Sequence, residues 1–289
     1  MIIVIDALNK HLHEDILDEM FRLRARVFAD RLGWDVTIED GREIDAFDAL
    51  DPAYVVGLDA EGHVISCVRA LQTTGPHMLS DVFHDILCGE APLRSPTLWE
   101  STRFCVDTER LSRDGGGMRS VNRATCELMI ASLDYARAAG ISDIVTVIDP
   151  VMNRVLKRSD CAPYDYVGET VPMGKVKAMA ALLDTSPERV ARLRAYAEID
   201  GEVFLSDAQA RELVEARRAA ERAEIEATMA SVLAPAPSGE TLREWCLAQI
   251  ADAANDEERR DAIRLHQRLL PGVALPAAEA ARETVETRA

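Results

Sequence analysis

Charged side chains recur in the first third of the chain, within segments that otherwise have the apolar composition of a protein core. They form an ordered series of arginines and acids: Arg24, Glu43, Asp45, Asp48, Arg69, Glu100 and Arg103. An unpaired charge inside a core costs several kcal/mol, so these side chains must meet and compensate one another. The fold must therefore bring distant segments together around one charged cluster. A cluster of this kind is a candidate active site.

The apolar periodicity predicts a β-hairpin followed by alternating strands and helices. Residues 14–31 have helical spacing, and residues 53–58 and 63–71 flank a turn that ends at Gly62. Beyond them we predict a strand at 98–106, a helix at 120–139, a strand at 144–148, a helix that begins at Pro150, and a last strand at 164–167 with the stretch near Val171. This order is typical of an α/β fold with a mixed β-sheet and helices on both faces.

The composition changes beyond about residue 198, where Ala, Glu and Arg dominate and strand signals disappear. The stretch from Pro235 to Gly239 separates two helical patterns at residues 207–233 and 241–270. We therefore predict a catalytic domain over residues 1–200 and a helical C-terminal extension of unknown role over residues 201–289. The residues after Gly272 are expected to fray.

Overall charge and cysteine usage narrow the class of protein. The formal net charge of −17 argues against a nucleic-acid partner, because neutralising phosphates requires a basic face. Six cysteines without paired spacing indicate reduced thiols rather than a disulfide framework or a metal site, which favours the cytoplasm. No stretch approaches the roughly 20 apolar residues of a membrane span, so no membrane insertion is expected.

The charged and aromatic series has the spacing of a known enzyme family. The patterns Arg24-x3-Phe28-x5-Trp34, Glu43-x-Asp45-x2-Asp48, Arg69 and Glu100-x-Thr102-Arg103-Phe104 resemble the signature of the acyl-homoserine-lactone synthases, over about residues 1–197. The resemblance implies an acetyltransferase-like three-layer α/β sandwich. It also implies transfer of an acyl group, from acyl carrier protein or coenzyme A, to the amine of S-adenosylmethionine. Lactone closure would then release methylthioadenosine and yield a quorum-sensing signal, with no cofactor besides the two substrates.

This chemistry suggests a role for each residue of the series. The protonated amine of S-adenosylmethionine attacks a thioester only after a base removes its proton, and Glu100 is the candidate base, with Thr102 beside it. Phe28 and Trp34 can enclose the sulfonium and the adenine. Asp45 and Asp48 can hold the ammonium, while Arg24, Arg69 and Arg103 pair with these acids and with the substrate carboxylate; Glu43 is a second-tier candidate. A purely structural salt-bridge network remains the alternative.

The acyl group requires an apolar pocket, for which Phe104, Met129, Thr146 and Met152 are the candidates. The resemblance associates the Thr146 hydroxyl with 3-oxo acyl groups, although a β-branched residue also suits a strand. Ser101 alternates with Thr102 along its strand and is expected to face away from the site.

An acidic acyl carrier protein would need a local basic surface. Arg154, Lys157 and Arg158 on one helix, with Lys175 and Lys177 near them in sequence, provide candidates, unless they are ordinary surface charges. A coenzyme A donor remains open as well. The glycines from Gly115 to Gly117 are either an anion cradle or a plain connector.

Two other functions are compatible with these patterns. One is an acetyl-CoA-dependent N-acetyltransferase of the same fold, and the other is a noncatalytic regulatory protein that binds S-adenosylmethionine. The sequence leaves open the acyl chain, the donor, the role of the extension and the oligomeric state.

Overall fold

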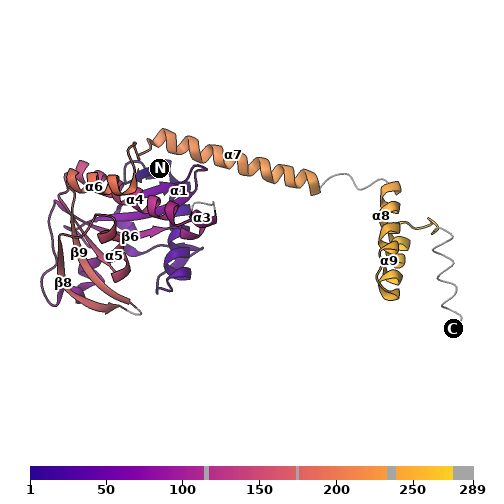
Figure 1. Cartoon of the computed structure of the whole chain (residues 1–289), viewed down its shortest axis with the longest axis horizontal. Coiled ribbons are helices and arrows are strands. Elements are labelled where there is room, and N and C mark those ends of the chain that lie inside the picture. The colour runs from indigo at the N-terminus through magenta and orange to yellow at the C-terminus, as the bar shows by residue number, and fades with distance from the viewer. Residues whose placement is uncertain (114–116, 174–175, 233–238, 276–289) are drawn as a thin grey trace. The chain divides into compact units, whose positions relative to one another are not determined.

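A seven-stranded β-sheet organises the N-terminal part of the protein (Figure 1). The computed structural model describes residues 1–113, 117–173, 176–232 and 239–275. Contacts divide the chain into two compact units, Met1–Glu221 and Arg222–Ala289. The sheet belongs to the first unit, and the second unit is helical.

The sheet is mixed, as the sequence predicts. Its strands lie in the order β1 (Ile2–Ile5), β4 (Ala53–Leu58), β5 (Val64–Gln72), β6 (Leu98–Val106), β7 (Asp143–Ile148), β9 (Val176–Asp184) and β8 (Asp165–Met173). Neighbouring strands are antiparallel except β6 and β7, which run parallel and pair only through Leu98–Ser101 and Asp143–Thr146. The rest of β6 is therefore free of β7, and this separation positions the cavity described below.

Helices cover both faces of the sheet, which confirms the predicted fold class. On one face α4 (Gly117–Ala138) and α6 (Pro187–Ala197) pack over a core that contains Val55. On the other face α1 (Glu14–Arg24) and the π-helix η2 (Ala25–Arg31) pack over a core that contains Val56. Adjacent residues of one strand thus serve opposite layers, as the pleat requires. Helix α5 (Pro150–Arg158) begins at Asp149, whose carboxylate accepts a hydrogen bond from the Met152 N–H.

Shorter elements connect these layers. They are η1 (Lys10–Leu12), β2 (Ile38–Glu39), β3 (Arg42–Glu43), η3 (Ala46–Leu50), α2 (Met78–Asp81), η4 (His84–Leu87) and α3 (Thr108–Arg113). The segment from Trp34 to Pro52, which has no clear periodicity in sequence, contains β2, β3 and η3. No described helix is long and apolar enough to span a membrane.

The prediction for the last strands of the sheet is incomplete. The sequence predicts one strand beyond residue 164, whereas β8 and β9 form a hairpin there (Figure 1). β9 has the sequence VKAMAALLD, whose alanines favour a helix over a strand. Pairing with β7 on one side and β8 on the other overrides this local preference. The apolar start of the chain forms the edge strand β1, for which the sequence analysis predicts no element.

The chain after residue 198 remains attached to the first unit through Glu221. Val203 accepts a hydrogen bond from the Ile2 N–H at 2.7 Å, and Asp207 meets the His13 ring nitrogen at 2.7 Å. The beginning of α7 (Asp207–Val232) then buries Ala210 and Val214. The contacts therefore divide the chain 21 residues later than the predicted boundary at residue 200, and the functional division into two domains stays a prediction.

The second unit contains two helices that pack on each other, α8 (Gly239–Ala251) and α9 (Asp256–Leu269). The predicted helical stretch over 241–270 is thus divided into two helices. Asn255 begins the second one, and its side chain accepts hydrogen bonds from the Glu257 and Glu258 N–H groups. Cys246, Ile250 and Ile263 are buried in this unit. Residues 235–238 of the predicted separator and residues 276–289 of the predicted frayed end lie outside the described residues.

These contacts predict different outcomes for two truncations. A chain that ends at Glu221 should keep the unfolding transition of the first unit to within about 0.5 kcal/mol, because the attached part of α7 is retained. A chain that ends at Phe204 should lose at least about 2 kcal/mol, since it removes the buried Val214 and the Asp207 contact to His13. Urea unfolding followed by circular dichroism measures both. Equal stability of the two truncated chains would contradict this assignment.

Candidate active site

The charged residues of the first third form a closed ring in which three acids each bridge two arginines. Arg24, at the end of α1, donates to Glu43 at 2.6 Å and to both carboxylate oxygens of Asp48 at 2.8 and 2.9 Å. Arg69, on β5, donates to Asp48 at 2.8 Å and to Asp45 at 2.5 and 3.0 Å.

Arg103, on β6, closes this ring. It donates to Asp45 at 2.8 Å and to Glu43 at 3.0 Å. The side chains of Arg24, Glu43 and Arg69 have no exposed surface, whereas that of Asp45 is 18% exposed. The expectation that the charges of the core-like segments compensate one another is confirmed for these six residues, whereas Glu100 lies outside the ring.

Local backbone chemistry positions the acids of the ring. The Asp45 carboxylate accepts a hydrogen bond from the Phe47 N–H, and the Asp48 carboxylate accepts one from the Asp45 N–H, which together cap the short helix η3. Two acids three residues apart therefore point to the same side of the turn. The Tyr54 hydroxyl, from β4, also donates to Asp48 at 2.7 Å.

The ring controls the ionisation of its members. Burial alone would raise the pKa of Asp48, but the hydrogen bonds and charges of Arg24 and Arg69 outweigh burial and hold that pKa well below its usual range. Burial and the adjacent Asp48 charge raise the pKa of the Tyr54 hydroxyl. Asp48 is therefore a carboxylate and Tyr54 a neutral donor at neutral pH.

An irregularity in β6 directs Arg103 into the site. Arg69 pairs with Thr102, but Cys67 pairs with Cys105, so two residues of β6 lie opposite one residue of β5. Arg103 lies in this β-bulge with a φ of 57°, a left-handed conformation that is uncommon for a side chain of this size. The bulge breaks the strand alternation and allows Thr102, Arg103 and Phe104 to line one cavity in succession.

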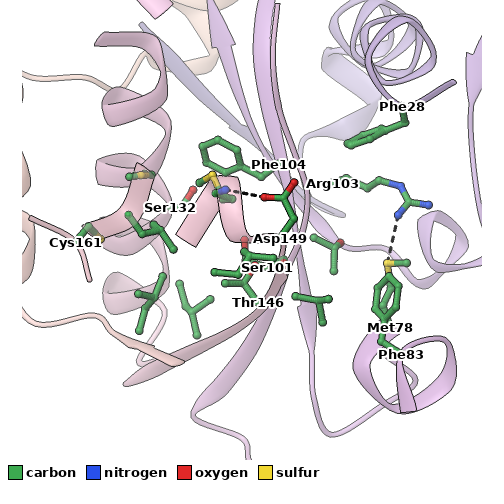
Figure 2. Close-up of a pocket in the computed structure, with 18 of the residues that line it drawn as sticks. Phe28, Met78, Phe83, Ser101, Arg103, Phe104, Ser132, Thr146, Asp149 and Cys161 are labelled. Carbon is green, nitrogen blue, oxygen red and sulfur yellow. Dashed lines mark hydrogen bonds between the residues drawn. The ribbon is translucent and has the colours of Figure 1, made fainter. Parts of the chain in front are cut away.

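Glu100 is buried on the same strand. Its carboxylate accepts hydrogen bonds from the Met78 N–H at 2.6 Å and the Leu79 N–H at 2.7 Å, at the start of α2. Burial raises the pKa of Glu100 to about 7, against the opposing effect of these two N–H groups and of Arg69. Met78 in turn lies beside two guanidinium groups. Its sulfur is 3.3 Å from Arg69 Nη2 and 3.5 Å from Arg103 Nη1 (Figure 2).

Two aromatic rings adjoin the arginine end of the site. Phe28 and Trp34 stack with ring centroids 5.0 Å apart and an interplanar angle of 22°. The Arg103 guanidinium carbon lies 5.5 Å from the centre of the Phe28 ring. Phe28 is buried, whereas Trp34 is 44% exposed. The pair therefore forms one wall that faces both the protein interior and solvent.

A cavity of about 220 Å³ extends from this wall into the protein at the place where β6 and β7 separate (Figure 2). One end carries the aromatic pair, Arg103 and Met78, and the other end is mainly apolar. The lining residues of the apolar end include Phe104, Met129, Leu133, Ile144, Ile148, Met152, Leu156, Cys161 and Leu183. Such a cavity can hold a charged group and an apolar chain side by side.

The predicted residues divide into two groups. Phe28, Trp34, Thr102 and Arg103 line the cavity, and so do all four predicted acyl-pocket residues, Phe104, Met129, Thr146 and Met152. Glu100 and the remaining ring members, Arg24, Glu43, Asp45, Asp48 and Arg69, do not line it. These residues contact one another or α2, so their direct contact with a substrate stays a prediction.

Several lining residues are not among the predicted ones. Met78 and Phe83 come from the segment between β5 and β6, whose short apolar stretches give no periodic signal. Ser101 lines the cavity together with Thr102, although the two alternate along β6. The position of Ser101 opposite Thr102 along the strand therefore does not remove it from the site, because the cavity meets both residues at the point where the pairing of β6 with β7 ends.

Basic side chains lie on the surface of α5. Arg154, Lys157 and Arg158 are exposed, and the Lys157 ammonium lies 5.9 Å from the centre of the Tyr166 ring. Lys177, on β9, is also exposed. Lys175 and the glycines Gly115 and Gly116 lie outside the described residues.

Comparisons with known proteins identify the family of this chain. Residues 8–193 match the family model described as autoinducer synthase. An acyl-homoserine-lactone synthase of Aeromonas salmonicida is 36% identical over 216 residues, which cover 74% of this chain and 99% of that protein. An acyl-homoserine-lactone synthase of Rhizobium radiobacter is 35% identical over 184 residues, which cover 63% of this chain and 85% of that protein.

Solved structures show the same fold. BjaI, a CoA-dependent acyl-homoserine lactone synthase solved with SAM and isopentyl-CoA, has a TM-score of 0.62 and 27% identity, over 73% of this chain and 97% of that chain. The synthase LasI has a TM-score of 0.57 and 30% identity, over 68% of this chain and 94% of that chain. The expected acetyltransferase-like α/β fold is confirmed. By the match of its residues 8–193, this chain belongs to the autoinducer synthase family.

Proposed function

We propose that this protein is an acyl-homoserine-lactone synthase. It transfers an acyl group from a thioester to the amine of S-adenosylmethionine and releases methylthioadenosine as the lactone closes, which produces a quorum-sensing signal. The observation that carries the proposal is the cavity, which joins an arginine and aromatic end to an apolar end within one family fold. The two substrates differ correspondingly: S-adenosylmethionine carries charges and an adenine ring, whereas the acyl chain is apolar.

S-adenosylmethionine occupies the arginine and aromatic end. Its sulfonium is a cation, and the stacked Phe28 and Trp34 rings present π-electron density toward it. Arg103 binds the methionine carboxylate by charge-assisted hydrogen bonds. Asp45 is the most exposed acid of the ring and is the one that meets the substrate ammonium.

The ring also positions these groups. Arg24, Glu43, Asp48 and Arg69 are at most 4% exposed, and their side chains make hydrogen bonds to one another and to Asp45, Thr102, Arg103 and Tyr54. They hold Asp45 and Arg103 in a fixed geometry, which is what an attack between two bound substrates requires.

Acyl transfer begins when Glu100 accepts a proton from the substrate ammonium, directly or through one water. A carboxylate with a pKa of about 7 is suited to this task near neutral pH. The free amine then attacks the thioester carbon, the carbon–sulfur bond breaks, and the thiol leaves with a proton as the amide forms. Thr102, whose hydroxyl accepts a hydrogen bond from Arg69 Nε at 3.0 Å, lies beside this centre.

Lactone closure follows on the same bound molecule. A carboxylate oxygen of the acylated methionine attacks the carbon next to the sulfonium, and that carbon–sulfur bond breaks. Methylthioadenosine leaves as a neutral thioether, so this step needs no further base. The folded conformation of the substrate brings the two reacting atoms together.

The acyl chain lies among Phe104, Met129, Thr146 and Met152. Its donor is acyl carrier protein or coenzyme A, and for the carrier protein the exposed Arg154, Lys157 and Arg158 of α5 supply a basic docking surface on an acidic molecule. With substrates of central metabolism and reduced cysteines, the enzyme works in the cytoplasm.

Mass spectrometry of the reaction products tests the proposal. Full-length protein is incubated with S-adenosylmethionine and a panel of acyl-carrier and acyl-CoA thioesters, and the organic extract is analysed for N-acyl-homoserine lactones. Lactone and methylthioadenosine in equal amounts support the synthase and identify the donor. Thioester consumption without lactone would favour a plain N-acetyltransferase, and binding of S-adenosylmethionine without turnover of any donor would favour a regulatory protein.

A further inference from the structure

We propose that a second cavity, at the end of the sheet where β6 begins, is a binding site for a small organic ammonium ion that carries an aromatic ring. This inference goes beyond the proposed function, because neither substrate of that reaction is assigned to this cavity. The second cavity has a volume of about 520 Å³, against about 220 Å³ for the cavity described above. Among the described residues, none lines both cavities. The protein therefore has a hollow of ligand size that the synthase reaction leaves unused.

Four strands end or begin around this second cavity. β1 ends at Ile5 and β5 at Gln72, while β4 begins at Ala53 and β6 at Leu98. Residues at or next to each of these points line the cavity, and α4 contributes Tyr135. This is the end of the sheet at which β6 and β7 are paired, so the separation of these strands, which opens the first cavity, lies toward the other end. The two cavities thus arise from different features of the fold.

The second cavity is negatively charged. Asp6 lines it, and among the described residues its carboxylate accepts only from the Leu8 N–H at 2.8 Å and from the Tyr135 hydroxyl at 3.4 Å. Asp51 also lines the cavity but pairs with Lys10. The described residues that line the cavity include no lysine, arginine or histidine. One negative charge, that of Asp6, is therefore uncompensated there.

An aromatic surface lies beside Asp6. Trp99 and Tyr135 both line the cavity, and their ring centroids lie 5.6 Å apart with an interplanar angle of 45°. Both side chains pack against the hydrophobic core, which fixes their positions. Burial and the nearby charge of Asp6 raise the pKa of the Tyr135 hydroxyl to about 12, so this hydroxyl stays a neutral donor at neutral pH. The faces of such rings attract cations.

These features select a ligand with one positive charge and a flat apolar body. An ammonium group donates charge-assisted hydrogen bonds to Asp6, and an aromatic ring attached to it packs against Trp99 and Tyr135. Asp6 would repel an anion. A second positive charge would find no acid without a partner, because Asp51 is already bound to Lys10. The class of ligand is therefore a protonated arylalkylamine.

Titrations followed by ligand-observed NMR test this site in the full-length protein, at neutral pH and low ionic strength. The three probes share one body and differ in charge: phenethylammonium, the neutral phenethyl alcohol and the anion phenylacetate. For the wild type we expect a Kd of about 0.1–1 mM for phenethylammonium, and binding at least about tenfold weaker for the other two probes.

Three variants locate the binding. Asp6→Asn keeps the side-chain shape and an oxygen that accepts from the Leu8 N–H, but it removes the charge. Its Kd for phenethylammonium should rise about tenfold, while that for phenethyl alcohol should change less than about twofold. Lys10→Gln leaves the Asp51 charge unpaired, so phenethylammonium should bind about threefold more tightly. Asp85→Asn is the matched control, because Asp85 is 76% exposed and lies outside the cavity, and its Kd should equal that of the wild type.

The outcomes decide the assignment without reference to catalysis. The same Kd in the wild type and in Asp6→Asn would place the probe elsewhere and overturn the site. No gain in Lys10→Gln, or a wild type that prefers the alcohol or phenylacetate, would overturn it as well. Lys10 is 53% exposed, so this variant gives an answer even where Asp6→Asn does not fold. None of these measurements needs turnover, and a failure of the synthase proposal is detected separately by the absence of lactone.

Discussion

Replacing Glu100 by glutamine is expected to lower kcat for lactone formation by about 10²–10⁴, the usual contribution of a positioned general base. The glutamine side chain has nearly the same shape and still accepts a hydrogen bond, but it cannot take a proton from the substrate ammonium. Steady-state kinetics with a saturating thioester measure this loss. A loss of this size would support a catalytic role for Glu100, which its buried position beside α2 does not establish.

The pH dependence of the wild type provides an independent test. Because the pKa of Glu100 is raised to about 7, the carboxylate form decreases as the pH falls through 7, and kcat/KM should decrease with it. The Glu100→Gln variant should lack this limb. Stability depends on pH in the opposite direction. The pKa of Glu100 is about 7 in the folded protein and 4.5 in the unfolded chain, so the folded protein binds this proton more tightly. As the pH rises from 4.5 to 7, the contribution of Glu100 therefore makes the protein less stable.

A structural role for Glu100 would give a different pattern. The Met78 and Leu79 N–H groups both donate to this carboxylate, and the glutamine amide nitrogen cannot accept from either of them. If anchoring α2 is its only task, the variant should be less stable, and the acid limb of its remaining activity should be unchanged. The exposed Glu90→Gln is the matched control, for which neither activity nor the unfolding transition should change.

Replacing Asp48 by asparagine should lower the free energy of unfolding by about 3–5 kcal/mol, because the buried Arg24 and Arg69 are then left with one acid each and the positive charge of the ring is no longer fully compensated. Asp48 accepts from Arg24, Arg69, Tyr54 and the Asp45 N–H, and its side chain is only 4% exposed. Its loss opens the ring at two arginines at once. Urea unfolding measures the change, and enzymatic activity should decrease with it.

Acid should produce the same weakening in the wild type. The pKa of Asp48 is depressed in the folded protein, so its contribution to stability is complete well above the ordinary value of 3.8 and is lost as the pH falls below it. Asp18→Asn is the control: its carboxylate also pairs with two arginines, Arg22 and Arg42, but is 42% exposed. That substitution should cost at most about 1 kcal/mol. Equal losses for the two variants would mean that the ring is not a buried unit.

Much of the fold could be predicted because signals within short stretches of sequence specify it. The hairpin of β4 and β5, the strand β6 and the helix α5 have apolar periodicity, turn residues or an N-terminal Pro that act within a few residues. β9 could not be predicted in this way, since its alanine-rich sequence becomes a strand only through its neighbours β7 and β8. The break between α8 and α9 has a local signal in Asn255, which the helical pattern around it obscured.

The sequence by itself determined that the charges must meet. Arginines and acids on apolar segments are expected to pair, because each would otherwise be buried alone; Glu100 is the exception, and two backbone N–H groups satisfy it instead. The spacing of those residues also identified the family. Tertiary structure alone decided how the charges are shared, with each acid between two arginines. It also decided which residues line the cavity: the bulge at Arg103 and the separation of β6 from β7 bring both Ser101 and Thr102 to it, and strand alternation cannot reveal this because both features depend on contacts between distant segments.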